Sequence, residues 1–314
     1  MTLHLKHKTY IIIVKLLLCI SLCLTTELAL AWNSVTILTT NDTSSVNDFV
    51  RELKQEVDNI EGVKVNLSKS DSGLSINIPK DTIVVAVGTQ ALKYASNLDE
   101  HTPVIGVLVP KSSYENILIE SKRKPNRFSA IYLDQPFSRQ LALIKAIFPN
   151  ITRIGVLLGP VSQFQSNDLQ SAAKKSNLEV DIQLVEKPSE LHENLEKVTA
   201  GKEVLLAIPD PLIYTRDTAQ TILLTTYRRQ APVIGFSKSY ARSGAIAAVF
   251  SSPKQYASEV AKTIKSLPRD YVSLPPASAS SQFSIEINRQ VARSLDIRIA
   301  DDETIYQQIL GDEK

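Results

Sequence analysis

The sequence predicts an α/β protein with two lobes, each built on a mostly parallel β-sheet flanked by helices. Short apolar runs alternate along the chain with helical patterns of roughly 10–15 residues, which is typical of βαβ units. About ten such runs occur in the 314 residues, too many for one compact sheet of the usual size. A connector rich in Pro, Ser and Ala follows at residues 268–281. Two lobes therefore fit the chain better than one.

The clearest unit is the stretch 129–160, which predicts a strand, a helix and a second strand. Pro136 stands where the first helical residue is expected, since its missing N–H costs nothing there. One apolar helical face follows, formed by Phe137, Leu141, Ile144 and Phe148. The nearly unbroken apolar run at 153–158 is typical of a strand buried on both faces. Ligands bind beyond the carboxyl ends of such strands.

The other elements follow from the same patterns. The expected strands are residues 35–39, 63–67, 83–87, 104–109, 179–185, 204–208, 232–236, 244–250 and 283–287. The expected helices are residues 46–57, a segment with Leu92 and Tyr94, and 168–176, 189–198, 216–229, 253–267, 288–295 and 303–310. Ser252 is placed as the cap of its helix, with Pro253 at the first position. Residues 68–78 and 110–127 are expected to be irregular.

The N-terminus predicts a secretory signal peptide, residues 1–31. Lysines precede an apolar run, and Ala29-Leu30-Ala31 forms the expected cleavage site. The alternative, an N-terminal membrane anchor, is disfavoured because Lys15 interrupts an apolar stretch shorter than the ~20 residues that span a bilayer. Export with cleavage after Ala31 predicts a periplasmic protein.

Composition excludes several classes of function. Both cysteines, Cys19 and Cys23, lie in the expected signal, so the mature chain has no disulfide or thiol nucleophile. Leu22 disfavours lipidation of Cys23, because such signals have a small residue there. Without the three lysines and one glutamate of the signal, the 35 basic and 33 acidic residues become 32 of each. This balance gives no support for nucleic-acid binding.

No catalytic or metal-binding motif is present. The two remaining histidines, His101 and His192, lie far apart in the sequence and in no cluster with metal-ligand spacing. The chain has no G-x-S-x-G, P-loop or G-x-G-x-x-G motif. We therefore expect a binding protein rather than an enzyme, with no cofactor and no metal.

Polar turns after buried strands are the candidate binding site. The candidate ligand-binding residues in or after these turns are Thr89, Gln90, Ser112, Tyr114, Ser162, Gln163, Asp210, Tyr214, Phe236 and Ser237. Helix-starting N–H groups at Thr89 and Gln90 suit a carboxylate, and Asp210 suits an ammonium. Tyr114, Tyr214 and Phe236 are the expected apolar walls, with Ser162 and Gln163 as hydrogen-bond partners. The alternative is that these residues only cap turns and helices.

Three segments resemble the substrate-binding proteins of ABC transporters, over most of residues 83–299. They are YLDQPFSRQLALIKAIFPNITRIGVLLGP, PVIGFSKSYARSGAIAAVFSSPKQYASEVAKTI and FSIEINRQVARSLDIRI. The resemblance implies a type I periplasmic-binding-protein fold with three hinge crossings, near Tyr132, at 241–244 and at 277–282. Lobe 1 is then residues 32–131 plus 244–276, and lobe 2 is residues 132–243 plus 282–314.

The resemblance also implies a function. It predicts a monomer that captures a small ligand, such as an amino acid, between its lobes for an ABC permease. The alternative partner is a membrane sensor of a signalling system. The turns at Pro110 and Gly159 differ from the Asp-Pro and Asn-Pro forms common in such proteins, so the ligand stays open.

Overall fold

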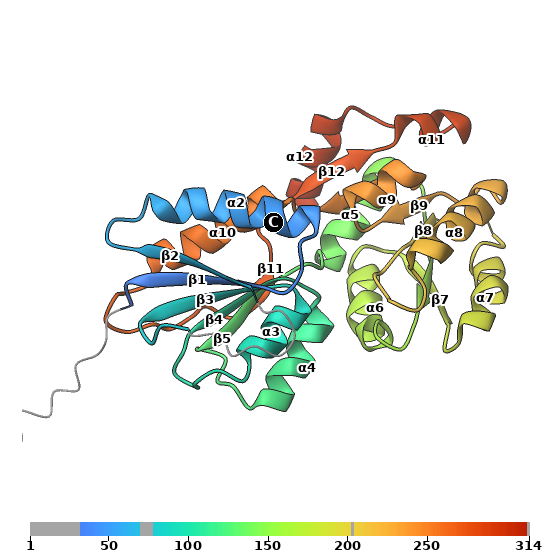
Figure 1. Ribbon diagram of the computed structural model, residues 1–314. Coiled ribbons are helices and arrows are strands. Elements are labelled where there is room, and N and C mark those ends of the chain that lie inside the picture. The colour runs from blue at the N-terminus through green and yellow to red at the C-terminus, as the bar shows by residue number, and fades with distance from the viewer. Residues whose placement is uncertain (1–31, 70–77, 202–203, 313–314) are drawn as a thin grey trace, which may run out of the picture.

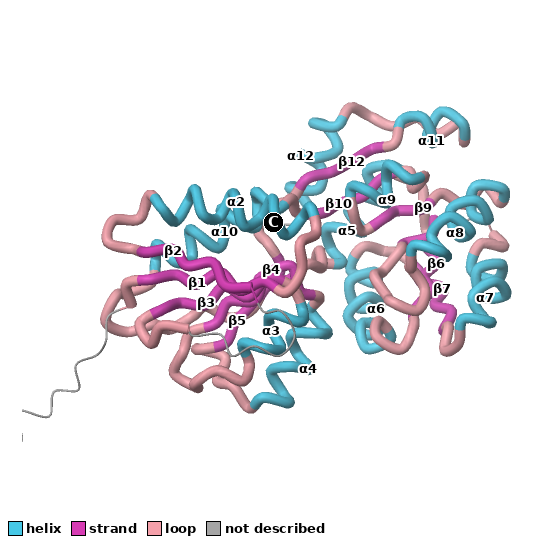
Figure 2. Tube along the Cα trace, viewed as in Figure 1, coloured by secondary structure: helices cyan, strands magenta, loops and turns pink. Residues whose placement is uncertain are grey.

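A computed structural model describes residues 32–69, 78–201 and 204–312. The expected signal peptide and most of the expected loop at 68–78 lie outside these residues. Figures 1 and 2 show two bodies side by side, each a twisted sheet with helices on both faces. The predicted α/β fold with two mostly parallel sheets is confirmed.

The first sheet has six strands, and all of its strand pairs are parallel. Its spatial order is β11 (Ser278–Ala279), β5 (Phe128–Tyr132), β4 (Val104–Val109), β3 (Thr82–Val87), β1 (Ser34–Thr39) and β2 (Lys64–Lys69). Its helices are α2 (Ser44–Asp58), α3 (Thr89–Ala95), α4 (Lys111–Ser121) and α10 (Pro253–Ser266).

The second sheet also has six strands, and it connects them in the same spatial order as the first sheet. It runs β12 (Ser284–Ile287), β10 (Ala247–Phe250), β9 (Val233–Gly235), β8 (Val204–Leu206), β6 (Arg153–Leu158) and β7 (Glu179–Leu184), with only β12 antiparallel among these strands. Its helices are α5 (Phe137–Ile147), α6 (Ser166–Lys175), α7 (Leu191–Val198), α8 (Arg216–Arg228), α9 (Lys238–Ser243), α11 (Arg289–Ser294) and α12 (Asp302–Asp312), with short turns η1 (Gln163–Gln165) and η2 (Pro188–Glu190).

Burial on both faces explains why these apolar runs form parallel strands. Every residue of β1 and β3 is buried, and helices cover each side of the sheet. On one side α2 and α10 contribute to the core, for example through Phe49 and Tyr256, and on the other α3 and α4 do so. Fully burying a side chain of this size stabilises the fold by about 1.5–3 kcal/mol. The carboxyl ends of the strands are thereby held in fixed positions.

The second crossing between lobes lies later than the sequence predicts. Residues 244–250 were expected in lobe 1, with a crossing at 241–244. Instead β10 pairs in parallel with β9, with Ala247 opposite Ile234. Gly244, at a φ of 138°, ends the short helix α9 that joins these neighbouring strands. The chain leaves the second lobe only after Phe250, and Ser252 then caps α10 as expected.

The segment 110–127 is also more regular than expected. It contains α4, whose buried side chains Tyr114 and Ile117 lie three residues apart. No local side chain caps the start of this helix. The capping group comes from 23 residues downstream, because the Lys111 N–H donates to Asp134 Oδ2 at 2.6 Å. Sequence patterns reveal only caps that lie next to a helix. Because the cap of α4 is distant in the sequence, the sequence did not predict this helix.

Candidate ligand site between the lobes

Three connections join the two lobes, and buried polar side chains tie them together. The chain crosses between β5 and α5, between β10 and α10, and between β11 and β12. Gln135 of the first connection donates to Ser251 Oγ of the second at 2.9 Å. Ser251 Oγ in turn donates to the carbonyl of Gln282 in the third at 2.6 Å. The crossings therefore form one connected hinge.

Arg139 on α5 completes this network. Its guanidinium donates to Gln135 Oε1 at 2.7 Å and to the carbonyl of Ser280 at 3.0 Å. It also lies over the ring of Phe283, 4.4 Å from the centroid. A buried charge needs such partners, so Arg139 fixes the positions of the first and third connections.

A small hollow lies beside these connections and is lined by both lobes. It encloses about 40 Å³, little more than the share of one water molecule in the liquid. The first lobe contributes Pro110, and the first connection contributes Leu133. The second lobe contributes apolar side chains at the carboxyl ends of its strands and on α5, namely Phe137, Ile208, Pro209, Phe236 and Val249. This hollow lies at the carboxyl ends of strands in the second sheet, the edge at which ligands of α/β sheets bind.

Asp134 is the one charged residue among those that line this hollow. Desolvation by burial raises its pKa above the ordinary value of 3.8, against the opposing effects of the backbone N–H groups of Lys111 and of Asp134 itself and of the Lys111 charge. The other polar groups there are the side chains of Gln135, Gln140 and Gln165. The amide of Gln140 is already committed, because it donates to the Gln135 carbonyl at 2.8 Å.

One ion pair bridges the lobes near this hollow. Lys111 at the start of α4 lies 3.0 Å from Asp168 Oδ2 on α6, measured from Nζ. The hydrogen bond that Lys111 donates to Asp168 raises the pKa of Lys111. Both side chains are more than a third exposed, so the pair contributes little to stability. It does hold the facing ends of two helices from opposite lobes together.

Two of the sequence-predicted site residues, Ser162 and Asp210, form hydrogen bonds with each other and do not line the hollow. Asp210 is 3 % exposed and Ser162 is fully buried. Asp210 Oδ2 accepts hydrogen bonds from the Ser162 hydroxyl and backbone N–H, both at 2.9 Å, and from the Val161 N–H at 3.1 Å. Its other oxygen accepts from the Leu212 N–H at 2.9 Å. These bonds fit the structural alternative, in which Asp210 holds turns of its own chain instead of a ligand ammonium.

The hydrogen bonds of Asp210 form a clamp that joins the turns after β6 and β8. Gly159 is part of this clamp. A Cβ at position 159 would lie 2.5 Å from Asp210 Oδ1. The Gly159 N–H also donates to Ser162 Oγ at 2.9 Å. The glycine is therefore required by the close approach of the carboxylate, which explains the G-P turn that the sequence places here.

Of the three aromatic residues predicted as walls of the site, only Phe236 lines the hollow. Phe236 lines the hollow, and Tyr214 lies behind it, with ring centroids 5.7 Å apart. Tyr240 packs against both rings. Tyr114 was expected in the site, but it is buried in the first lobe, where its hydroxyl donates to the Phe128 carbonyl at 2.8 Å. Tyr114 lies on α4 rather than in a turn, and its side chain packs in the core of the first lobe.

The remaining predicted residues lie near strand ends without lining the hollow. Thr89 and Gln90 begin α3, and Ser112 lies in the first turn of α4. Exposed Gln163 donates to the Pro160 carbonyl at 3.2 Å. Ser237 accepts from the Tyr240 N–H at 3.1 Å and so caps α9. The sequence signal for the missed residues was the Leu133-Asp134-Gln135 run directly after a buried strand and before Pro136.

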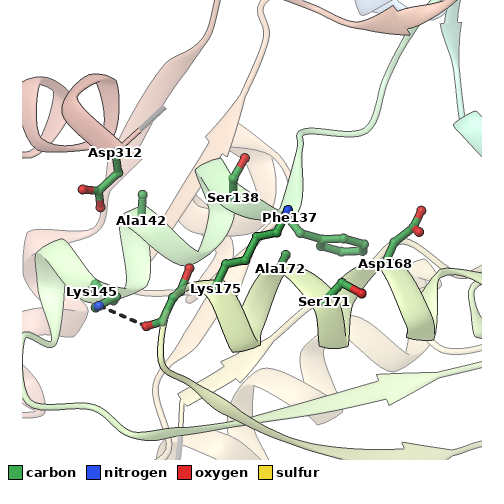
Figure 3. A pocket seen from close by; sticks show the side chains of 10 residues that line it. Phe137, Ser138, Ala142, Lys145, Asp168, Ser171, Ala172, Lys175 and Asp312 are labelled. Atoms are coloured by element: carbon green, nitrogen blue, oxygen red, sulfur yellow. Dashed lines mark hydrogen bonds between the residues drawn. The ribbon is translucent and has the colours of Figure 1, made fainter. Parts of the chain in front are cut away.

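A second hollow of about 590 Å³ lies between α5 and α6. Figure 3 shows its lining, with Phe137 and Ser138 on one helix and Lys175 reaching across from the other. Lys145 donates to the Ser176 carbonyl at 3.0 Å at its far end. All of its lining residues belong to the second lobe. A ligand in this second hollow would contact one lobe only, whereas the first hollow is lined by both lobes.

The fold and the hollow between its lobes define a two-lobed periplasmic-binding-protein architecture. The chain belongs to the family of ABC transporter substrate binding proteins, whose model matches residues 56–308. This confirms the resemblance seen in the sequence. No curated protein sequence matches the chain.

Solved structures agree with this fold. An ABC domain from Streptococcus pneumonia in complex with L-Trp is 17% identical, with a TM-score of 0.59, covering 87% of this chain and 98% of its own. The ligand-free, open CD0873 of Clostridium difficile, a substrate binding protein with adhesive properties, is 13% identical, with a TM-score of 0.66 and coverages of 87% and 97%. AraP, an arabinose binding protein from Geobacillus stearothermophilus, is 11% identical, with a TM-score of 0.52 and coverages of 83% and 99%.

These relatives define what is common to the class. They are binding proteins rather than enzymes, and proteins of this family typically act in the periplasm or outside the cell. Such proteins work with a small-molecule ligand and an ABC permease. Across residues 32–69, 78–201 and 204–312, no helix has the length and apolar character needed to traverse a membrane.

Proposed function

We propose that this chain is an exported solute-binding protein that captures a small organic molecule between its lobes and delivers it to an ABC permease. The observation that carries the proposal is the hollow beside the three connections, which is lined by residues of both lobes. A ligand seated there contacts both lobes, so it favours a more closed arrangement over the open one.

The size and lining of the hollow fit this role. Its volume of about 40 Å³ is too small for an organic ligand, so a bound ligand requires more space between the lobes than this hollow encloses. Its walls are mostly apolar, with a few amide and carboxylate groups, which is the usual composition of small-molecule sites. The L-Trp and arabinose named for the two relatives show that this fold accepts ligands of different chemistry.

Ligand screening tests the proposal. Thermal melting of the 32–314 chain is recorded with amino acids, amines, sugars and nucleobases. A ligand at 100 times its dissociation constant adds about 2.7 kcal/mol to the free energy of unfolding. We expect Phe236→Ala to remove most of the shift, because Phe236 lines the hollow. Lys175→Ala is the matched control, because Lys175 lines only the groove between α5 and α6.

Export and partner are tested separately. Intact mass of the periplasmic protein is expected to show a chain that begins at Trp32. Reconstitution with an ABC permease encoded by an adjacent gene is expected to show ligand-dependent stimulation of ATP hydrolysis. Binding to a membrane sensor without any effect on a permease would favour the signalling alternative.

A further inference from the structure

We propose that Asp134 receives a positively charged nitrogen of the ligand, so that the ligand class is a small organic ammonium compound with an apolar body. This inference rests on the proposed function, because it assigns a role within the same interlobe site. It differs from the sequence prediction, which gave this role to Asp210.

The charge balance of the hollow is the first argument. Asp134 is the one charged residue among those that line it, and its other lining groups are apolar side chains and amides. A ligand cation would meet an opposite charge at this hollow. A carboxylate or phosphate without an amine would meet a like charge instead, which is unfavourable in an apolar setting.

The unused bonding capacity of the carboxylate is the second argument. Asp134 Oδ2 accepts from the Lys111 N–H at 2.6 Å. Within the part of the chain that the structure describes, no ion pair involves Asp134, and Lys111 Nζ is directed to Asp168 instead. A carboxylate has two oxygens with about four lone-pair positions, so room for further donors remains. Asp210, by contrast, accepts four hydrogen bonds from its own chain.

The cost of burying this charge is the third argument. Burial of Asp134 disfavours the ionised form, and the backbone N–H groups and the charge of Lys111 offset this effect only in part, since the pKa stays raised. An ammonium that enters the hollow supplies further compensation, since charge-assisted hydrogen bonds are the stronger ones. Phe137, Ile208 and Phe236 line the same hollow and would contact the carbon skeleton of the ligand from one side.

The competing explanation is that Asp134 serves only as the cap of α4. Its bond to the Lys111 N–H is real and fits that role. Asp134→Asn separates the two explanations, because the amide oxygen of asparagine can still accept from that N–H while the charge is gone. A cap-only residue predicts unchanged ligand affinity in this variant.

The experiment compares matched probes by calorimetric titration. The probes are 2-phenylethylamine, L-phenylalanine, the neutral 2-phenylethanol, the anionic 3-phenylpropionate, and arabinose, with hits from the wider screen treated in the same way. We expect wild-type protein to bind ammonium-bearing probes in preference to the neutral and anionic ones. Asp134→Asn is expected to weaken that binding about tenfold or more. Glu115→Gln, on the exposed side of α4, is expected to change it less than about twofold.

The outcomes distinguish this inference from the proposed function. Tight binding of a neutral or anionic ligand that is unaffected by Asp134→Asn but lost in Phe236→Ala would overturn the role of Asp134 and leave the interlobe site standing. Ammonium binding with equal affinity in Asp134→Asn and wild type would also overturn it. No binding of any probe or screened compound by the wild-type chain would count against both proposals.

Discussion

The side-chain amide of Gln135 donates to the hydroxyl of Ser251 at 2.9 Å, across 116 residues of sequence. This bond links the first interlobe connection to the second, and Ser251 passes the link to the third through the Gln282 carbonyl. Hinges normally comprise a few residues that absorb backbone changes. Here a buried polar network holds all three connections in register.

Gln135→Ala tests the energetic weight of this network. The change leaves the buried Arg139 guanidinium with one hydrogen-bond acceptor fewer. We expect the free energy of unfolding to fall by about 1–3 kcal/mol, measured by urea denaturation. Gln163→Ala is the control, because Gln163 is exposed and donates only to a neighbouring carbonyl. Equal effects of the two substitutions would contradict a structural role for the network.

Asp210→Ala tests the clamp between the turns after β6 and β8. Removal of the carboxylate leaves the Ser162 hydroxyl and three backbone N–H groups without their acceptor. We expect a loss of about 2–4 kcal/mol in the free energy of unfolding, since buried donors are costly to leave unpaired. Gly159→Ala is expected to cost about 1–3 kcal/mol by forcing its Cβ against the same carboxylate. Full stability in either variant would disprove the clamp.

Most of the fold could be predicted from the sequence because buried parallel strands and their helices leave local patterns. The 153–158 run and the Ser252-Pro253 helix start are of this kind, and both lie where expected. The second crossing could not be predicted in this way. Whether residues 244–250 pair with one sheet or the other depends on strand pairing, which leaves no local signal.

A binding site is harder to predict from the sequence than the fold, for a related reason. Sequence patterns identify polar groups at strand ends, but they do not show which of them are satisfied within the chain. Asp210 and Asp134 both follow buried strands. Only the three-dimensional structure shows that Asp210 is bonded to Ser162 and its neighbours, while Asp134 is among the residues that line the interlobe hollow.

Lys111→Ala tests the ion pair across the lobes. Because Lys111 and Asp168 are both solvent-exposed in part, the change in free energy of unfolding is expected to stay below about 1 kcal/mol. The effect is expected in the arrangement of the lobes, as a larger radius of gyration of the ligand-free protein in X-ray scattering. High salt is expected to produce the same shift in the wild-type chain. Scattering that is insensitive to both changes would contradict a bridging role.

The raised pKa of Asp134 predicts a dependence of stability on pH. Because the folded-state pKa lies above that of the unfolded chain, the folded protein binds more protons between these two values. Stability contributed by this group therefore falls as pH rises through the folded pKa. Asp134→Asn is expected to unfold at a higher denaturant concentration than wild type at pH 7, with the difference shrinking toward pH 4.

Neighbouring groups do not obscure this test. Lys111, Tyr132 and Tyr256 share charge interactions with Asp134, and the pKa of each is raised above an ordinary value near or above 10. Their protonation is therefore constant between pH 4 and pH 7. A difference between variant and wild type that is independent of pH would contradict the shifted titration of Asp134.

X-ray scattering of the 32–314 chain with and without the first ligand that raises its melting temperature tests the central claim most directly. The account predicts a smaller radius of gyration in the bound state, because a ligand in the interlobe cleft draws both lobes together. The same ligand is expected to leave the scattering of Phe236→Ala unchanged at the concentration that saturates wild type. Binding without any compaction of the wild-type chain would place the ligand on one lobe and contradict the account.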